Sequence, residues 1–221
     1  MRKIITLIIV FVCIQSLNAQ NTFNLDNKSS SIYLRSGIEP TVGFALGYMQ
    51  SFTIQPLEKT LVLFGEISGP KKDFGFNNYE TKVGGIINAY KYKNFGITYN
   101  LNFSTGHVST KNFGSQKFAF ANKLLIGYFK PKWYIVFTGE HEKIFANKIT
   151  NTQYYRDYIY PEAKDGWYNG AGGNIQLGLE TGLTIKELVD VRFELKIPKS
   201  EKFNSYYGSP AHINLIFAYR F

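Results

Sequence analysis

The two-residue alternation of apolar and polar side chains is the feature that most constrains how this chain can fold. It occurs over residues 212–221, where one set of alternate positions holds Ile213, Leu215, Phe217, Tyr219 and Phe221. A period of two places alternate side chains on opposite faces of a β-strand. After the first 20 residues, no segment sustains the 3.6-residue apolar period of an amphipathic helix. We therefore predict an all-β fold with negligible helix.

The same alternation recurs along the chain, with turn residues between the segments. It predicts ten strands, over residues 30–37, 41–54, 60–68, 79–90, 95–106, 118–129, 133–142, 168–185, 189–197 and 211–221. Apart from 38–40, the connections alternate between short turns (55–59, 91–94, 130–132, 186–189) and long loops (69–78, 107–117, 143–167, 198–210). This asymmetry is typical of a single antiparallel up-and-down transmembrane β-barrel. Eight strands are the alternative count, and a soluble β-sandwich or lipocalin-like barrel is the alternative fold.

The N-terminal residues have the pattern of an export signal. Arg2 and Lys3 precede an apolar run over residues 4–14, and the small residue Ala19 follows. This order predicts a cleaved signal peptide over residues 1–19, a periplasmic segment over 20–29 and a barrel over 30–221. The only cysteine, Cys13, lies in the signal, so the exported chain needs no disulfide.

Composition narrows the partners that the chain can have. The net charge is +9, and aromatic residues make up 17% of the chain. An exported chain seldom meets nucleic acid, so we predict no nucleic-acid partner and expect outer-membrane lipid or lipopolysaccharide to supply the opposite charge. The three histidines lie on separate segments, so neither a metal site nor another cofactor is predicted.

Placing the apolar alternates toward lipid puts the remaining alternates inside the barrel. The charged residues among them are Arg35, Glu66, Glu80, Lys82, Lys123, Glu140, Glu142, Glu180, Asp190, Arg192, Glu194, Lys196 and Arg220. Isolated charges in a low-dielectric interior are very costly, and the two signs are nearly balanced here. We therefore predict a salt-bridged, filled lumen in which Asp190 or Glu194 binds Arg220. The small inward side chains over residues 43–47 predict close packing of large neighbours or a narrow cavity.

One pair of residues has the spacing of a hydrolytic site. His107 and Ser109 are two apart at the end of a predicted strand, so they share a face. Glu140 or Glu142 is the candidate acid. The His-x-Ser triplet resembles that of outer-membrane lipid A deacylases over three residues, although Thr110 stands where that family has Asn. This resemblance implies a lipid-modifying hydrolase, and the competing interpretation is a polar transition from strand to loop.

The longest predicted loop is rich in aromatic and charged side chains. The candidate binding residues in it are Tyr154, Tyr155, Arg156, Asp157, Tyr158, Tyr160 and Trp167. Aromatic rings stack on sugars, and carboxylates bind divalent cations through oxygen. The alternative is that these rings belong to an aromatic girdle and fold the loop over the barrel mouth.

The order of these features resembles that of small outer-membrane β-barrel proteins of Bacteroidetes-type bacteria. The resemblance depends on the Asn-Ala-Gln end of the signal at 18–20, the alternating strands and the terminal Ala-Tyr-Arg-Phe at 218–221. It implies a location in the Gram-negative outer membrane and recognition of Tyr219 and Phe221 by the barrel-assembly machinery. We predict a non-enzymatic barrel whose external loops contact surface glycan, lipid or a protein partner. The alternatives are a lipid-modifying hydrolase and a narrow porin-like transport barrel.

Overall fold

The computed structural model describes residues 30–38, 42–54, 59–71, 77–170, 172–201 and 210–221. The predicted signal peptide and the segment 20–29 lie outside these ranges. The elements within them are β1 (Ser30–Ile38), β2 (Val42–Ile54), β3 (Lys59–Pro70), β4 (Asn78–Tyr92), β5 (Phe95–Ser109), β6 (Phe113–Phe129), β7 (Trp133–Asn151), α2 (Gln153–Tyr158), β8 (Gly166–Asn169), β9 (Gly173–Ile185), β10 (Val189–Ser200) and β11 (His212–Arg220).

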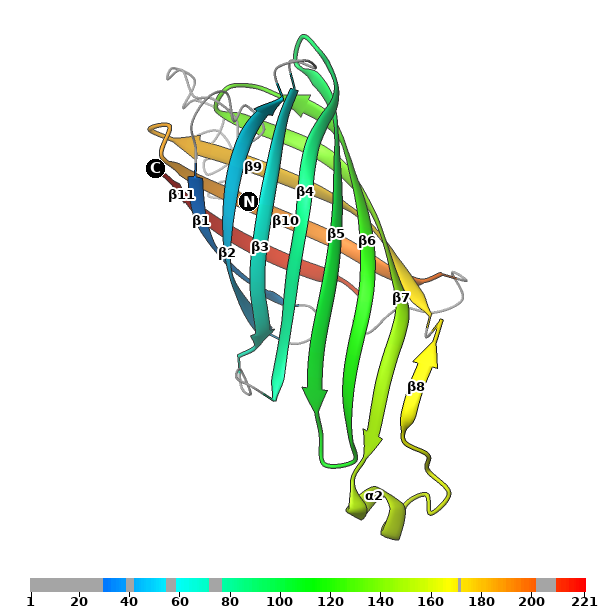
Figure 1. Ribbon diagram of the computed structural model, residues 1–221. Coiled ribbons are helices and arrows are strands. Elements are labelled where there is room, and N and C mark those ends of the chain that lie inside the picture. The colour runs from blue at the N-terminus through cyan, green and yellow to red at the C-terminus, as the bar shows by residue number, and fades with distance from the viewer. Residues whose placement is uncertain (1–29, 39–41, 55–58, 72–76, 171, 202–209) are drawn as a thin grey trace, which may run out of the picture.

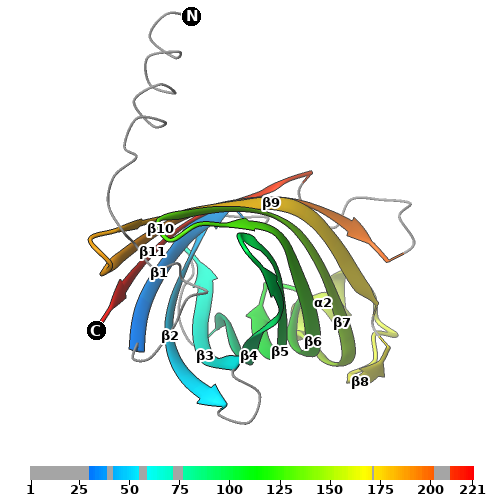
Figure 2. The ribbon, with the colours of Figure 1, turned by 90° about the horizontal axis from the view of Figure 1, so that it is seen from above.

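Ten of these strands form a closed antiparallel barrel (Figure 1, Figure 2). Successive strands of the ring pair with one another, β7 pairs with β9, and β11 pairs with β1 to close the ring. Within the described residues, β8 pairs only with the outer part of β7 and stands apart from the ring. The predicted all-β barrel of ten strands is confirmed, and the alternative of eight strands is wrong.

The alternation in the sequence determines which side of the wall each side chain faces. In β11, His212 and Asn214 are buried, whereas Leu215 and Phe217 are exposed. In β10, the four charged side chains at alternate positions from 190 to 196 are all buried. Because a strand in a barrel has one face toward the lumen and one away from it, charge lies inside the wall and apolar surface lies outside.

Four neighbouring strands, β4 to β7, reach farthest toward the lower end of Figure 1. β4 and β5 have 15 residues each, β6 has 17 and β7 has 19. Residues 107–117 and 143–151, predicted as loop, are therefore strand except for the turn at 110–112. The prediction was wrong here because polar and apolar residues do not alternate regularly at these strand ends, although the backbone pairing continues. We call residues 105–118 and 145–169 the arm.

The tip of the arm contains two local features that the alternation did not predict. The six-residue helix α2 begins after Thr152, whose hydroxyl accepts a hydrogen bond from the Tyr155 amide at 3.2 Å. The predicted strand over 168–185 is interrupted between β8 and β9. Gly170 and Gly172 have φ of +65° and +98° there, a left-handed conformation that ends a strand and favours glycine.

The side chains that face the lumen differ in kind between the two ends of the barrel. We call the end of the barrel that carries the turns at 93–94, 130–132 and 186–188 the short-turn end. Toward this end the lumen holds two apolar clusters, which consist of Tyr33, Met49, Val62, Phe64, Ile86, Ile216 and Ala218 in one and Leu125, Phe129, Tyr134 and Val136 in the other. Toward the arm, the side chains that face the lumen are mainly charged or amide-bearing.

Candidate functional site

The outer surface of the barrel is apolar over most of its height. Large side chains on neighbouring strands are exposed, among them Leu101 on β5, Leu124 on β6 and Phe137 on β7, which is 72% exposed. Toward the arm, the buried side chains between them in sequence are mainly polar or small, such as Asn102 and Thr138, whereas Leu125 and Val136 belong to an apolar cluster nearer the short-turn end. The polarity of this wall is the reverse of that of a water-soluble barrel, in which apolar side chains fill the interior.

Aromatic side chains gather at both ends of this apolar surface. The exposed rings at the short-turn end are Tyr90, Tyr92, Phe95, Tyr128, Trp133, Tyr219 and Phe221. The rings at the base of the arm are Phe103, Phe118, Phe120, Phe145 and Trp167, and neighbouring rings have centroids 5.1 to 6.4 Å apart. Phe118 and Tyr128 are ten residues apart on β6, or about 34 Å along a strand. With a tilt of about 40°, the two aromatic zones are about 25 Å apart along the barrel axis.

A chain of ion pairs crosses the middle of the lumen. Lys123 on β6 donates to Glu180 on β9 at 2.8 Å and to Glu194 on β10 at 2.6 Å. Lys196 binds Glu194 at 2.9 Å and Glu140 on β7 at 2.9 Å. Cations and carboxylates therefore alternate across four strands, which is how buried charges are compensated without water.

A second group of ion pairs lies nearer the arm. Lys117 on β6 binds Glu80 on β4 at 2.7 Å and Glu142 on β7 at 3.0 Å. Lys82 binds the other oxygen of Glu80 at 3.2 Å. Lys117 was absent from the predicted set because residues 107–117 were assigned to a loop. Lys117 and Lys123 are an even number of residues apart, so they share one face of a strand. This spacing could have placed Lys117 on the lumen face.

Two tyrosines pack on glycines that lie directly opposite them on the next strand. The ring of Tyr33 covers Gly47, and its hydroxyl donates to Glu66 at 2.9 Å; Glu66 also binds Arg35 at 2.7 Å. The close packing foreseen for the small inward face of β2 is thus present at Gly47. Tyr134 covers Gly182 on β9 in the same way and donates to Glu180 at 2.6 Å.

Arg192 on β10 is another buried cation of the lumen. Arg192 is 7% exposed, and its Nε and Nη2 atoms have no hydrogen-bond partner among the described residues. The neighbouring carboxylates are engaged elsewhere, because Asp190 binds Arg220 at 2.8 Å and Glu180 binds Lys123. Arg192 therefore lies in the lumen near Asp190 and Glu180, although its Nε and Nη2 atoms hydrogen-bond to neither of them.

The structure gives the candidate hydrolytic residues other neighbours, and Glu142 binds Lys117 at 3.0 Å. The ring of His107 lies 6.2 Å from the ring of Tyr79, and the amide of Ser109 donates to Asn78 Oδ1 at 3.1 Å. Glu140 faces the lumen and binds Lys196 at 2.9 Å, whereas His107 lies on β5 at its arm end. No group of three or more potential metal ligands occurs in the part of the chain that the structure describes.

The candidate binding residues lie at the tip of the arm. Arg156 binds Asp165 at 2.6 Å, and Lys111 lies 3.8 Å above the centroid of the Tyr154 ring. The Tyr158 side chain is 76% exposed and Trp167 is 58% exposed. The Asp165 carboxylate accepts hydrogen bonds from the backbone and side chain of Asn151, which together with Arg156 lower its pKa to about 2. The tip is therefore an ordered structure that exposes aromatic rings.

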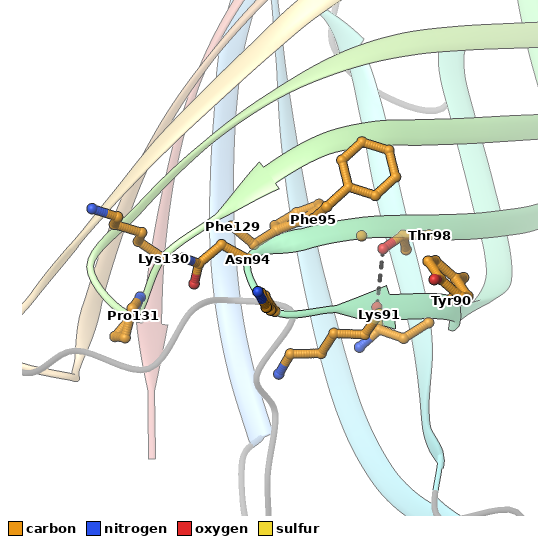
Figure 3. A pocket seen from close by; sticks show the side chains of 11 residues that line it. Tyr90, Lys91, Asn94, Phe95, Thr98, Phe129, Lys130 and Pro131 are labelled. Carbon is orange, nitrogen blue, oxygen red and sulfur yellow. Dashed lines mark hydrogen bonds between the residues drawn. The ribbon is translucent and has the colours of Figure 1, made fainter.

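A pocket of about 140 Å³ lies at the short-turn end, between the β4–β5 turn and the β6–β7 turn (Figure 3). Lys91, Lys93 and Lys130 line it, and the lining holds no carboxylate of the described residues. Asn94 joins the two turns, since its carbonyl accepts from the Phe129 amide at 2.6 Å and its side chain donates to Tyr128 at 3.0 Å.

Comparisons with known proteins give a fold resemblance and no family. No protein-family model matches the chain, and no curated protein does. Among solved structures, the chain is similar to a KdgM porin at 10% identity, with 86% of this chain and 99% of that chain covered and a TM-score of 0.40. No helix in the described ranges is long and apolar enough to span a membrane.

Proposed function

We propose that this protein is an outer-membrane β-barrel of a Gram-negative bacterium with a closed lumen and an arm that contacts ligands outside the membrane. The reversed polarity of the wall is the observation that carries this proposal. Apolar patches of this extent would drive a protein in water to associate. In a bilayer they are the surface that meets the hydrocarbon, and the separation of about 25 Å between the aromatic zones matches its thickness in such barrels.

The filled lumen supports a role other than open diffusion. The ion pairs of Lys123 and Lys196 link β6, β7, β9 and β10 across the interior, and the apolar clusters occupy the short-turn half. A selective pore has an excess of one charge along an open path. The paired charges here neutralise one another, so we propose that the barrel serves as an anchor for the arm.

The arm is the surface that we assign to binding. Its tip exposes Tyr158 and Trp167, and cationic Lys111 and Lys148 lie over aromatic rings. Exposed rings beside cations bind sugars, anionic lipids and protein surfaces. We propose surface glycan, lipid or a protein partner as the ligand class, with recognition of Tyr219 and Phe221 by the assembly machinery as a separate prediction.

Three measurements test the proposal. A folded membrane barrel migrates differently before and after boiling in detergent gels, and the purified protein should also insert into lipid vesicles. In planar bilayers it should give no steady conductance. Reproducible open channels would favour the porin-like alternative instead.

A second experiment tests the arm. Residues 152–165 are replaced by a short glycine–serine turn, and binding of whole-cell surface polysaccharide and lipopolysaccharide is compared with that of the intact protein. Loss of binding with unchanged heat-modifiable mobility is expected. Unchanged binding would overturn the role of the arm.

A further inference from the structure

Strand β8 is the edge of the sheet that forms the arm. Along one side, β7 pairs first with β9, over residues 133–143, and then with β8, over residues 146–149. Among the described residues, no strand pairs with the second side of β8. Figure 1 shows β8 beside the lower end of β7, outside the ring. Because the ring of the barrel is closed, β8 gives the arm an open side that the barrel itself lacks.

The backbone of β8 determines what kind of ligand fits this open side. In an antiparallel pair, alternate residues direct both their N–H and their C=O to the same neighbour. The Gly170 amide donates to the Phe145 carbonyl at 3.1 Å, so Tyr168, two residues away, also directs its backbone groups to β7. Trp167 and Asn169 therefore direct theirs to the open side. An extended polypeptide can pair with such a row through its own backbone, which neither a sugar nor a lipid has.

The side chains of β8 add contact area on both faces of the strand. Trp167 and Tyr168 point to opposite faces, and they are 58% and 44% exposed. The ring of Trp167 lies 5.9 Å from the ring of Phe118 on β6, and the Tyr168 hydroxyl donates to the Lys164 carbonyl at 3.1 Å. Proline and charged residues protect the exposed edges of many sheets. Neither occurs in Gly166–Asn169, so the edge is left suited to pairing.

We propose that a partner protein binds the arm by adding an extended segment as a further strand along the open side of β8. This inference rests on the proposed binding role of the arm, and it selects a protein from the ligand classes named there. Backbone hydrogen bonds to Trp167 and Asn169 supply the affinity. Alternate side chains of the segment pack beside Trp167 on one face and Tyr168 on the other, so we expect the segment to carry aromatic or β-branched residues.

A synthetic peptide tests strand addition. The probe is the fluorescein-labelled peptide of residues 143–151, because this sequence already pairs with β8 as part of β7. Fluorescence anisotropy is measured with the full chain in detergent micelles, and we expect saturable binding. The control is the same peptide with N-methylated backbone amides, which cannot donate hydrogen bonds. Equal binding of the two peptides, or no binding of either, would overturn the proposal.

Two substitutions at one position locate the binding. Asn169→Pro removes an N–H that points to the open side, and proline is tolerated at such positions of edge strands. Asn169→Ala is the matched control, because it removes the side chain and keeps the N–H. The peptide should bind about two- to ten-fold more weakly to the proline variant than to the alanine variant, as for the loss of one hydrogen bond. Equal affinity for the two variants would show that β8 is not the site.

The remaining outcomes separate this inference from the proposed function. β8 lies outside residues 152–165, so replacing that segment and substituting Asn169 test different parts of the arm. If the protein binds polysaccharide through residues 152–165 but does not bind the peptide, only strand addition is wrong. If polysaccharide, lipopolysaccharide and peptide all fail to bind, the binding role of the arm is wrong as well. Dimers of the parent in sedimentation experiments, with a monomeric Asn169→Pro variant, would identify a second copy of the chain as the occupant and overturn the assignment to another protein.

Discussion

Arg220 on β11 binds Asp190 on β10 through two nitrogen atoms, with Nε 2.9 Å from Oδ2 and Nη2 2.8 Å from Oδ1. The Thr184 hydroxyl donates to the same Oδ1 at 2.7 Å. The side chains of Arg220 and Asp190 are 8% and 1% exposed, so this pair is nearly dry. It ties β9, β10 and β11 together close to the short-turn end.

Replacing Arg220 by methionine should destabilise the barrel strongly. Asp190 would keep its charge in the interior without a cation, and breaking a buried pair in this way costs about 3–5 kcal/mol. The free energy of unfolding, measured by urea titration in detergent micelles, should fall by about that amount. The double variant Arg220→Met/Asp190→Asn should recover most of the loss. A single variant as stable as the parent would mean that the pair is hydrated.

Replacing Arg192 by methionine should stabilise the barrel, which is the opposite of the effect expected for Arg220→Met. Its Nε and Nη2 atoms are buried without a hydrogen-bond partner among the described residues. Removing an unsatisfied buried group while keeping its volume should raise the free energy of unfolding by about 1–3 kcal/mol in the same titration. A destabilisation as large as that of Arg220→Met would show that an ion or water compensates this guanidinium inside the lumen.

The glycine at position 47 should not tolerate a methyl group. A Cβ there would overlap the ring of Tyr33, which would then lose its hydrogen bond to Glu66. We expect Gly47→Ala to lower the melting temperature and the free energy of unfolding by about 1–3 kcal/mol. Gly65→Ala is the control, because a Cβ at Gly65 has nothing within 4 Å. Equal stability of the two variants would contradict the packing.

The tip of the arm should depend on pH only under strongly acidic conditions. Hydrogen bonds from Asn151 and Arg156 lower the pKa of Asp165 from 3.8 to about 2. The stabilisation is complete above pH 3.8 and disappears as the pH falls through about 2. Carbon-13 NMR titration of the Asp165 carboxyl should show that midpoint, and Arg156→Gln should move it toward 3.8. A midpoint near 3.8 in the parent would show that the hydrogen bonds do not form.

The ends of strands could be predicted well only where they meet the short turns. The predicted starts at Phe95, Trp133 and Val189 and the predicted ends at Phe129 and Ile185 are those observed. Apolar alternation runs to these positions and is followed directly by lysine, proline or a tight turn. At the other end, polar and apolar residues no longer alternate regularly, so the periodicity does not indicate where pairing stops.

The charged residues in the lumen could also be predicted only in part. The position of a residue in the two-residue alternation is enough to predict which charges face inward, because side chains point to alternate faces of a strand. It is not enough to predict their partners. Lys123 and Glu194 are 71 residues apart, and their meeting depends on the register of four strands and on the closure of the ring. The interrupted strand over 168–185 shows the same limit, since a positive φ at Gly170 depends on the pairing around it.

The closure of the ring also bears on how the barrel forms. Ser31 and Arg220 are register partners although they lie at opposite ends of the described chain. Contacts between residues so distant in sequence form slowly, because most of the chain must be ordered before they bring any gain. Until β11 arrives, β1 presents an unpaired edge that favours aggregation. A newly made chain is therefore prone to aggregation until the barrel closes, and the pairing of β11 with β1 removes the exposed edge.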